Sequence, residues 1–143
     1  MSECVEKKFP SFFPENIIPE DAEYREEKVY RICRWGKIDK DAFISTYEEY
    51  IRGNIQNKDL DLSDPGTYST STFFNKRDAR GILKCITRYK PAAIVALGKT
   101  NPEYGPIQVT KNRTGQKNSH VDWWLFEQAD PSDEFEEVDV YEK

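Results

Sequence analysis

Apolar residues in this chain occur in short segments with two different spacings, and this patterning limits the fold more than any other feature. Side chains in residues 27–35 and 120–126 alternate between two faces, which is typical of β-strands. Residues 75–86 instead repeat apolar side chains three and four positions apart, starting from an asparagine suited to cap a helix. The pattern therefore predicts strands and helices in one fold.

Four further strands are expected, in residues 67–74, 92–97, 107–111 and 135–141. A turn signal between the second and third of these predicts a hairpin, and the last is expected at a sheet edge. A helix of roughly three turns is expected between an Asp39 cap and Gly53, with Glu48 and Glu49 facing water. Because strands and helices do not alternate regularly, we expect an α+β fold with a mainly antiparallel sheet of five or six strands and two to three helices.

The length of 143 residues suits one domain, which we expect to comprise residues 1–129. Residues 1–26 are predicted to form an extended arm packed on it, because Pro10, Pro14 and Pro19 block a continuous helix while the aromatic residues between them can pack. A proline-aromatic motif exposed to a protein partner is the alternative. Residues 130–143 are acidic and are expected to form a final strand or a tail.

No segment approaches the roughly 18 consecutive apolar residues of a membrane helix, so no membrane partner is expected. The N-terminus lacks the apolar core of a secretory signal, which favours a cytoplasmic location. Cys4, Cys33 and Cys85 are widely spaced, so reduced thiols are expected rather than disulfides, and with one histidine no metal site is expected. Glycine-rich phosphate loops are absent from the sequence, which excludes nucleotide kinases and Rossmann enzymes.

The net charge of −5 is unevenly distributed along the chain. Basic residues dominate the segment 76–117, and acidic residues dominate the chain on either side of it. This basic segment could bind a nucleotide or a nucleic acid, with Tyr89 and Tyr104 as stacking platforms, or its charges could pair with the acidic segments. An acidic chain is a poor general nucleic-acid binder, so nucleic acid is the less favoured partner.

His120 and Asp122 are two residues apart in a predicted strand, so their side chains share one face. A carboxylate at this distance can hydrogen-bond an imidazole, which makes an acid–base pair feasible. A nucleophile would have to come from elsewhere, and Ser71 and Cys33 are both candidates. A structural role for the histidine in a packed sheet face is the alternative.

Three motifs occur in a recognisable order: Arg31 or Arg34, then Ser69-Thr70-Ser71, then Glu134-Phe135-Glu136. This order resembles the arginine-serine-glutamate class of ADP-ribosyltransferases. The resemblance implies that Arg31 contacts the phosphates of NAD and that Ser69 braces the nicotinamide pocket. It further implies that Glu136 stabilises an oxocarbenium-like transition state while Glu134 assists the acceptor, chemistry that charge complementarity makes reasonable.

These observations predict a pocket on neighbouring strands. Its expected catalytic residues are Glu136, His120 and Asp122, and its expected ligand-binding residues are Arg31, Ser69 and Ser71. The expected function is that of a small accessory domain that binds a ligand or a protein partner, including a second copy of itself. An NAD-dependent ADP-ribosyltransferase is the first alternative, and a nucleotide or nucleic-acid binder acting through residues 76–117 is the second.

Overall fold

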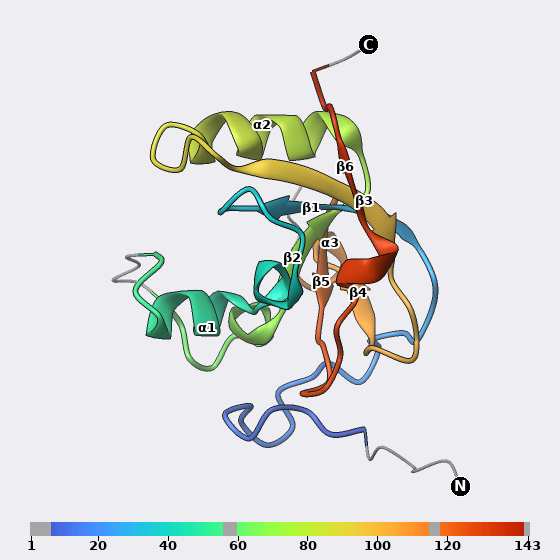
Figure 1. The fold of residues 1–143 in the computed structure, drawn as a ribbon. Coiled ribbons are helices and arrows are strands. Elements are labelled where there is room, and N and C mark those ends of the chain that lie inside the picture. Colours follow the sequence, from blue (N-terminus) through green and yellow to red (C-terminus); the bar gives the residue numbers. More distant parts are fainter. Residues whose placement is uncertain (1–6, 56–59, 115–117, 142–143) are drawn as a thin grey trace, which may run out of the picture.

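The computed structural model describes residues 7–55, 60–114 and 118–141, which contain a single six-stranded antiparallel sheet (Figure 1). Its strand order is β4-β5-β2-β1-β3-β6. The strands are β1 (Lys28–Cys33), β2 (Thr70–Phe73), β3 (Ile94–Lys99), β4 (Ile107–Val109), β5 (His120–Trp123) and β6 (Glu136–Val138). The predicted α+β class and antiparallel sheet are confirmed.

Short helices connect the strands. The α-helices are α1 (Thr46–Ile51), α2 (Lys76–Ile86) and α3 (Lys111–Thr114), and the 3-10 helices are η1 (Lys40–Phe43), η2 (Pro65–Tyr68) and η3 (Ser132–Glu134). Asn75 caps α2 as predicted, because its side chain accepts a hydrogen bond from Asp78 N at 2.8 Å. In the described part of the chain, no helix is both long enough and apolar enough to cross a membrane.

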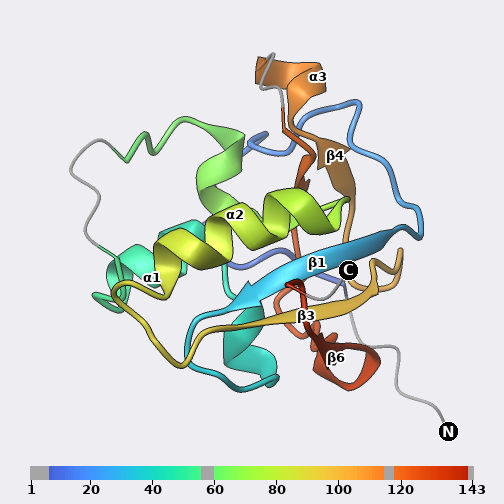
Figure 2. The same cartoon turned by 90° about the horizontal axis from the view of Figure 1, so that it is seen from above.

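The sheet has a core on each face. Helix α2 covers one face, here called the α2 face, and lies along β1 (Figure 2). There Ala79 and Leu83 pack with Ile32, Phe73 and Val95. The opposite face, here called the η1 face, is covered by η1 and by the segment around η3. Its core residues are Val29, Phe43, Ala96, Ile107, Val121, Trp123 and Phe135.

The prediction of one continuous helix after Asp39 is wrong, because the helical segment divides into η1 and α1. Ile44 and Ser45 between them are extended, with ψ angles of 156° and 165°. Ser45 provides the second cap, since its hydroxyl accepts from Glu48 N at 3.2 Å. The break turns Glu49 inward, where it is buried and its Oε2 lies 3.3 Å from Arg34 Nε. The expectation that Glu49 faces water is therefore wrong as well.

The predicted hairpin between residues 92–97 and 107–111 is also wrong. Strand β3 pairs with β1 over six residues, from Lys28↔Lys99 to Cys33↔Ile94, and with β6 on its other side. Strand β4 pairs with β5 at the opposite edge of the sheet. Gly105 permits this path, because its φ is +142° and a Cβ there would lie 1.8 Å from Trp124 O.

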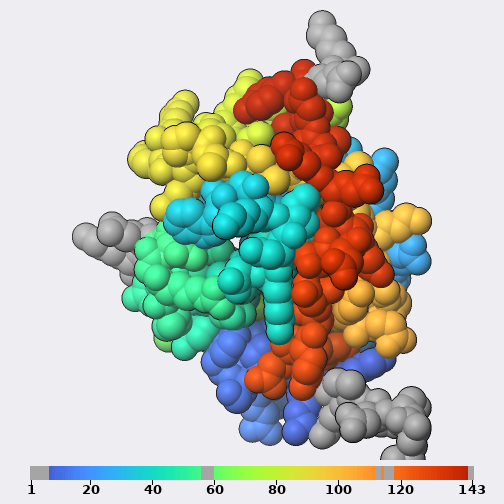
Figure 3. All heavy atoms as spheres, viewed as in Figure 1, coloured from blue at the N-terminus to red at the C-terminus, as the bar shows by residue number. Residues whose placement is uncertain are grey.

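The N-terminal arm contacts the domain mainly through aromatic rings. Ring centroids lie 4.8 Å apart for Phe9 and Phe126, and 5.0 Å apart for Phe12 and Tyr47. Further along the arm, the backbone of Glu23 forms an isolated bridge with β4. The arm thereby lies against α1 and the segment after β5, on the face seen in Figure 3.

Candidate functional site

Four of the predicted site residues meet on the α2 face of the sheet. The register pairs Ser71 with Asp122 and Phe73 with His120, so Ser71, His120 and Asp122 project from the same face. Ser69, directly before β2, donates its hydroxyl hydrogen bond to Asp122 Oδ1 at 2.5 Å. Asp122 is completely buried, so hydrogen bonds from the protein, such as that from Ser69, stabilise its carboxylate in place of water.

His120 is positioned through a threonine that the sequence analysis did not identify. Thr110 Oγ1 donates to Asp122 Oδ2 at 2.8 Å and lies 2.5 Å from His120 Nδ1. A hydroxyl has one proton, so when it donates to Asp122 its oxygen accepts from Nδ1. This arrangement favours the tautomer with the proton on Nδ1 and the lone pair on Nε2. Asp122 therefore orients the imidazole through Thr110, since its Oδ1 is 3.9 Å from Nδ1.

A cavity of about 250 Å³ lies beside this network, between the sheet and α2. Its polar lining includes His120, Ser71, Asn118, Arg31 and Arg34, while α2 contributes the apolar side chains of Ile82 and Ile86. The cavity thus combines hydrogen-bonding groups on the sheet with a hydrophobic wall, as small-molecule sites commonly do. We call it the α2 cavity.

The side chain of Arg31 is directed to the other face of the sheet. Alternation along β1 places it with Val29 and Cys33, and it is 7% exposed. Each guanidinium nitrogen donates to a backbone carbonyl: Nε to Ala42 O at 2.8 Å, Nη1 to Ser71 O at 3.0 Å and Nη2 to Ile44 O at 3.2 Å. Burial lowers the pKa of this guanidinium. Arg31 thus ties η1 and β2 to β1. It lines the α2 cavity together with Arg34, but its guanidinium is committed to these three carbonyls.

The two candidate nucleophiles lie in different environments. Cys33 is buried on the η1 face, and burial raises the pKa of its thiol to about 11. It is therefore protonated near neutral pH and separated from His120 by the sheet. Ser71 shares the α2 cavity with His120. The two are diagonal neighbours on adjacent strands, with roots about 7–8 Å apart, so they do not form a preassembled hydrogen-bonded pair.

Glu136 lies away from the other predicted site residues. It begins β6, which β1 and β3 separate from β2, a distance of about 14 Å at the usual spacing between strands. It lines a different pocket, of about 570 Å³, together with Glu134, Lys28 and Lys99. The structure brings Ser69, Ser71, His120 and Asp122 together and leaves Glu136 at the far edge of the sheet.

Neither metal ligation nor similarity to other proteins adds to this picture. Among the residues that the structure describes, no three His, Cys, Asp or Glu side chains gather as a metal site would require. In comparisons with known proteins, no family model matches the chain, and no curated protein or solved structure is similar to it. The geometry of the α2 cavity is therefore the basis for the functional argument.

Proposed function

We propose that this chain is a ligand-binding domain that holds a small anionic molecule in the α2 cavity. The proposal rests on the observation that His120, Ser71, Asn118 and Arg34 all line one cavity. Thr110 and Asp122 hold the imidazole in place there. A ligand oxygen can accept hydrogen bonds from the serine hydroxyl, the asparagine amide and the guanidinium.

The charges around the cavity favour an anion. Two arginines line the cavity, and the guanidinium of Arg31 already donates to three carbonyls. The side chain of Arg34 is 28% exposed, so it can contact both the ligand and Glu49. The buried carboxylate of Asp122 already accepts hydrogen bonds from Ser69 and Thr110, which spreads its charge. The exposed side chains of Arg77 and Lys84 on α2, and of Arg88 after it, raise the local positive potential.

The volume of the cavity limits the size of the ligand. About 250 Å³ lies just below the range of about 300–1,000 Å³ that is typical of drug-sized ligands. A carboxylate- or phosphate-bearing metabolite therefore fits better than a whole dinucleotide such as NAD, only part of which would be enclosed. The apolar side of such a ligand would lie against Ile82 and Ile86.

Isothermal titration calorimetry with inorganic phosphate, AMP, citrate and NAD tests this proposal. We expect saturable binding of at least one of the first three probes, weakened about tenfold by Arg34→Met, a loss of about 1.4 kcal/mol. Glu136→Gln is the matched control, because Glu136 lies outside the cavity. Absence of binding by all four probes, or equal binding by Arg34→Met and the wild type, would overturn the proposal.

The transferase alternative is tested in the same preparation by measuring nicotinamide release from NAD. Turnover by the wild type that folded Glu136→Gln loses would favour ADP-ribosyl transfer. Turnover that Glu136→Gln retains would exclude Glu136 from the chemistry. Circular dichroism establishes that each variant is folded before either assay.

A further inference from the structure

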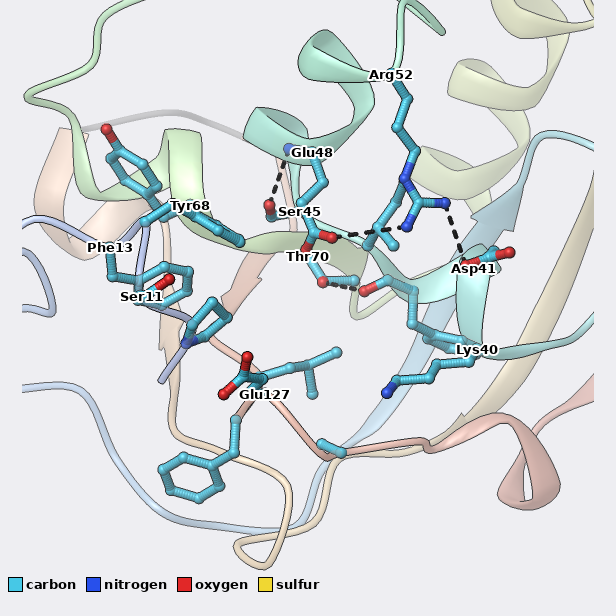
Figure 4. Close-up of a pocket in the computed structure, with 17 residues that line it drawn as sticks. Ser11, Phe13, Lys40, Asp41, Ser45, Glu48, Arg52, Tyr68, Thr70 and Glu127 are labelled. Atoms are coloured by element: carbon cyan, nitrogen blue, oxygen red, sulfur yellow. Dashed lines mark hydrogen bonds and ion pairs between the residues drawn. The ribbon is translucent and has the colours of Figure 1, made fainter. Parts of the chain in front are cut away.

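A further pocket, of about 300 Å³, lies on the η1 face of the sheet (Figure 4). Its walls come from four separate parts of the chain: the arm at residues 10–13, the η1–α1 segment, Tyr68 with Thr70, and the segment after β5 that begins at Leu125. Thr70 lines it, whereas the neighbouring Ser71 lines the α2 cavity, and the two cavities share no residue. We call it the arm pocket, and the function proposed above does not use it.

One side of the arm pocket is aromatic. Phe12, Phe13, Tyr68 and Phe126 line it, and Phe13 and Tyr68 lie with ring centroids 5.6 Å apart. The hydroxyl groups at the base are already engaged, since Thr70 Oγ1 donates to Phe43 O at 2.6 Å and Ser45 Oγ accepts from the backbone of α1. This part of the pocket therefore offers a surface for an apolar group.

The charged side chains at the rim differ in whether they have partners. Arg52 has two, because its Nη1 lies 3.1 Å from Asp41 Oδ1 and its Nη2 lies 3.9 Å from Glu48 Oε2. Lys40 and Glu127 form no side-chain hydrogen bond or ion pair within residues 7–55, 60–114 and 118–141. Figure 4 shows the lysine and the glutamate reaching into the hollow from two sides.

From this arrangement we infer that the arm pocket binds a free α-amino acid with an apolar side chain. The ligand carboxylate accepts from Lys40 Nζ, the ligand ammonium donates to Glu127, and the side chain lies on the aromatic wall. A plain anion would leave Glu127 without a counter-charge, and a plain amine would leave Lys40 without one. A zwitterion satisfies both free charges at once.

The test compares three probes of nearly the same shape: L-leucine, 4-methylpentanoate, which lacks the ammonium, and 3-methylbutylamine, which lacks the carboxylate. Binding is followed by nuclear magnetic resonance through the backbone amides of Ser45 and Thr70, which line the pocket. We expect leucine to bind about threefold more tightly than either analogue, because each analogue lacks one of two partly exposed ion pairs and such pairs are individually weak.

Two variants assign the contributions. Lys40→Met is expected to weaken leucine to the affinity of 3-methylbutylamine, whose own binding it leaves unchanged. Glu127→Gln is expected to weaken leucine to the affinity of 4-methylpentanoate. Lys37→Met and Glu20→Gln are matched controls, because both residues are exposed and lie outside the pocket.

Two results would overturn the inference. The first is that leucine causes no saturable shifts at Ser45 and Thr70 up to about 10 mM, which means a binding free energy weaker than about −2.7 kcal/mol. The second is that the wild type binds leucine and 3-methylbutylamine with equal affinity. His120→Gln separates this inference from the proposed function. It is expected to leave leucine binding intact, because His120 lies on the opposite face of the sheet.

Discussion

Replacement of Arg31 by methionine tests the structural role that its hydrogen bonds define. The side chain donates to the carbonyls of Ala42, Ser71 and Ile44, and two of these belong to the buried η1 segment. Methionine retains much of the aliphatic length but none of the donors. The three carbonyls then lose their partner in a place that water reaches poorly.

The expected loss of stability follows from the number of hydrogen bonds. Each lost partner costs about 1 kcal/mol and more when the acceptor stays buried, so three give about 3 kcal/mol. This is a large share of the roughly 5–15 kcal/mol that stabilises a typical domain. At a urea m-value of about 1.5–2 kcal/mol per molar, the unfolding midpoint should fall by about 1.5–2 M.

Urea unfolding followed by tryptophan fluorescence measures this shift, because Trp123 and Trp124 are fully buried in the native state. Arg25→Met is the matched control, since Arg25 is half-exposed and pairs with Glu23 and Glu27 at the surface. We expect the control to lose less than about 1 kcal/mol. A loss of similar size in Arg31→Met would refute the reasoning that these hydrogen bonds hold η1 and β2 to β1.

Three further predictions concern other parts of the chain. Gly105→Ala is expected to destabilise the fold by several kcal/mol, because the added Cβ would collide with a backbone carbonyl at a positive φ; thermal unfolding measures it, and an unchanged midpoint contradicts it. The hydrogen bonds from Ser119 lower the pKa of Asp78, so its ionised form stabilises the fold above about pH 4 and this contribution is lost as the pH falls through the lowered pKa. Wild type and Asp78→Asn should thus differ in urea stability at pH 7 and converge as the pH falls below the lowered pKa, and a difference that stays constant in acid would count against the assignment. Cys85 is exposed, and Cys33 is buried with a raised pKa. Of these two thiols, iodoacetamide at pH 8 should therefore label only Cys85, which peptide mass spectrometry can show. Equal labelling of both in the native protein would contradict the described burial.

Local patterns in the sequence were sufficient to predict the elements and the shared face of the site. The two-residue repeat predicts β1 and β5 and places His120 with Asp122, because side chains two apart on a strand project from the same face. The cap at Asn75 and the spacing after it predict α2. These properties depend on neighbouring residues, so the sequence contains them directly.

Properties set by distant residues could not be read in this way. The order of strands depends on which pairs bury most apolar surface. The hairpin predicted between residues 92–97 and 107–111 is the local pairing, but β3 instead forms its long ladder with β1. The strand pattern around Arg31 predicts only the face of the sheet to which its side chain projects. It does not predict the three carbonyls that accept from the guanidinium, because they belong to other segments. Thr110 reaches His120 because β4 pairs with β5, a contact that no motif indicates.

The strand order also bears on how the chain folds as it is synthesised. Residues 118–141 supply both β5, which lies between β4 and β2, and β6, which forms the opposite edge of the sheet. Until these last residues emerge, β4 has only its isolated bridge to Glu23 in place of a neighbouring strand. A nascent chain therefore exposes apolar strand surface until residues 118–141 have emerged, and the sheet is complete only then.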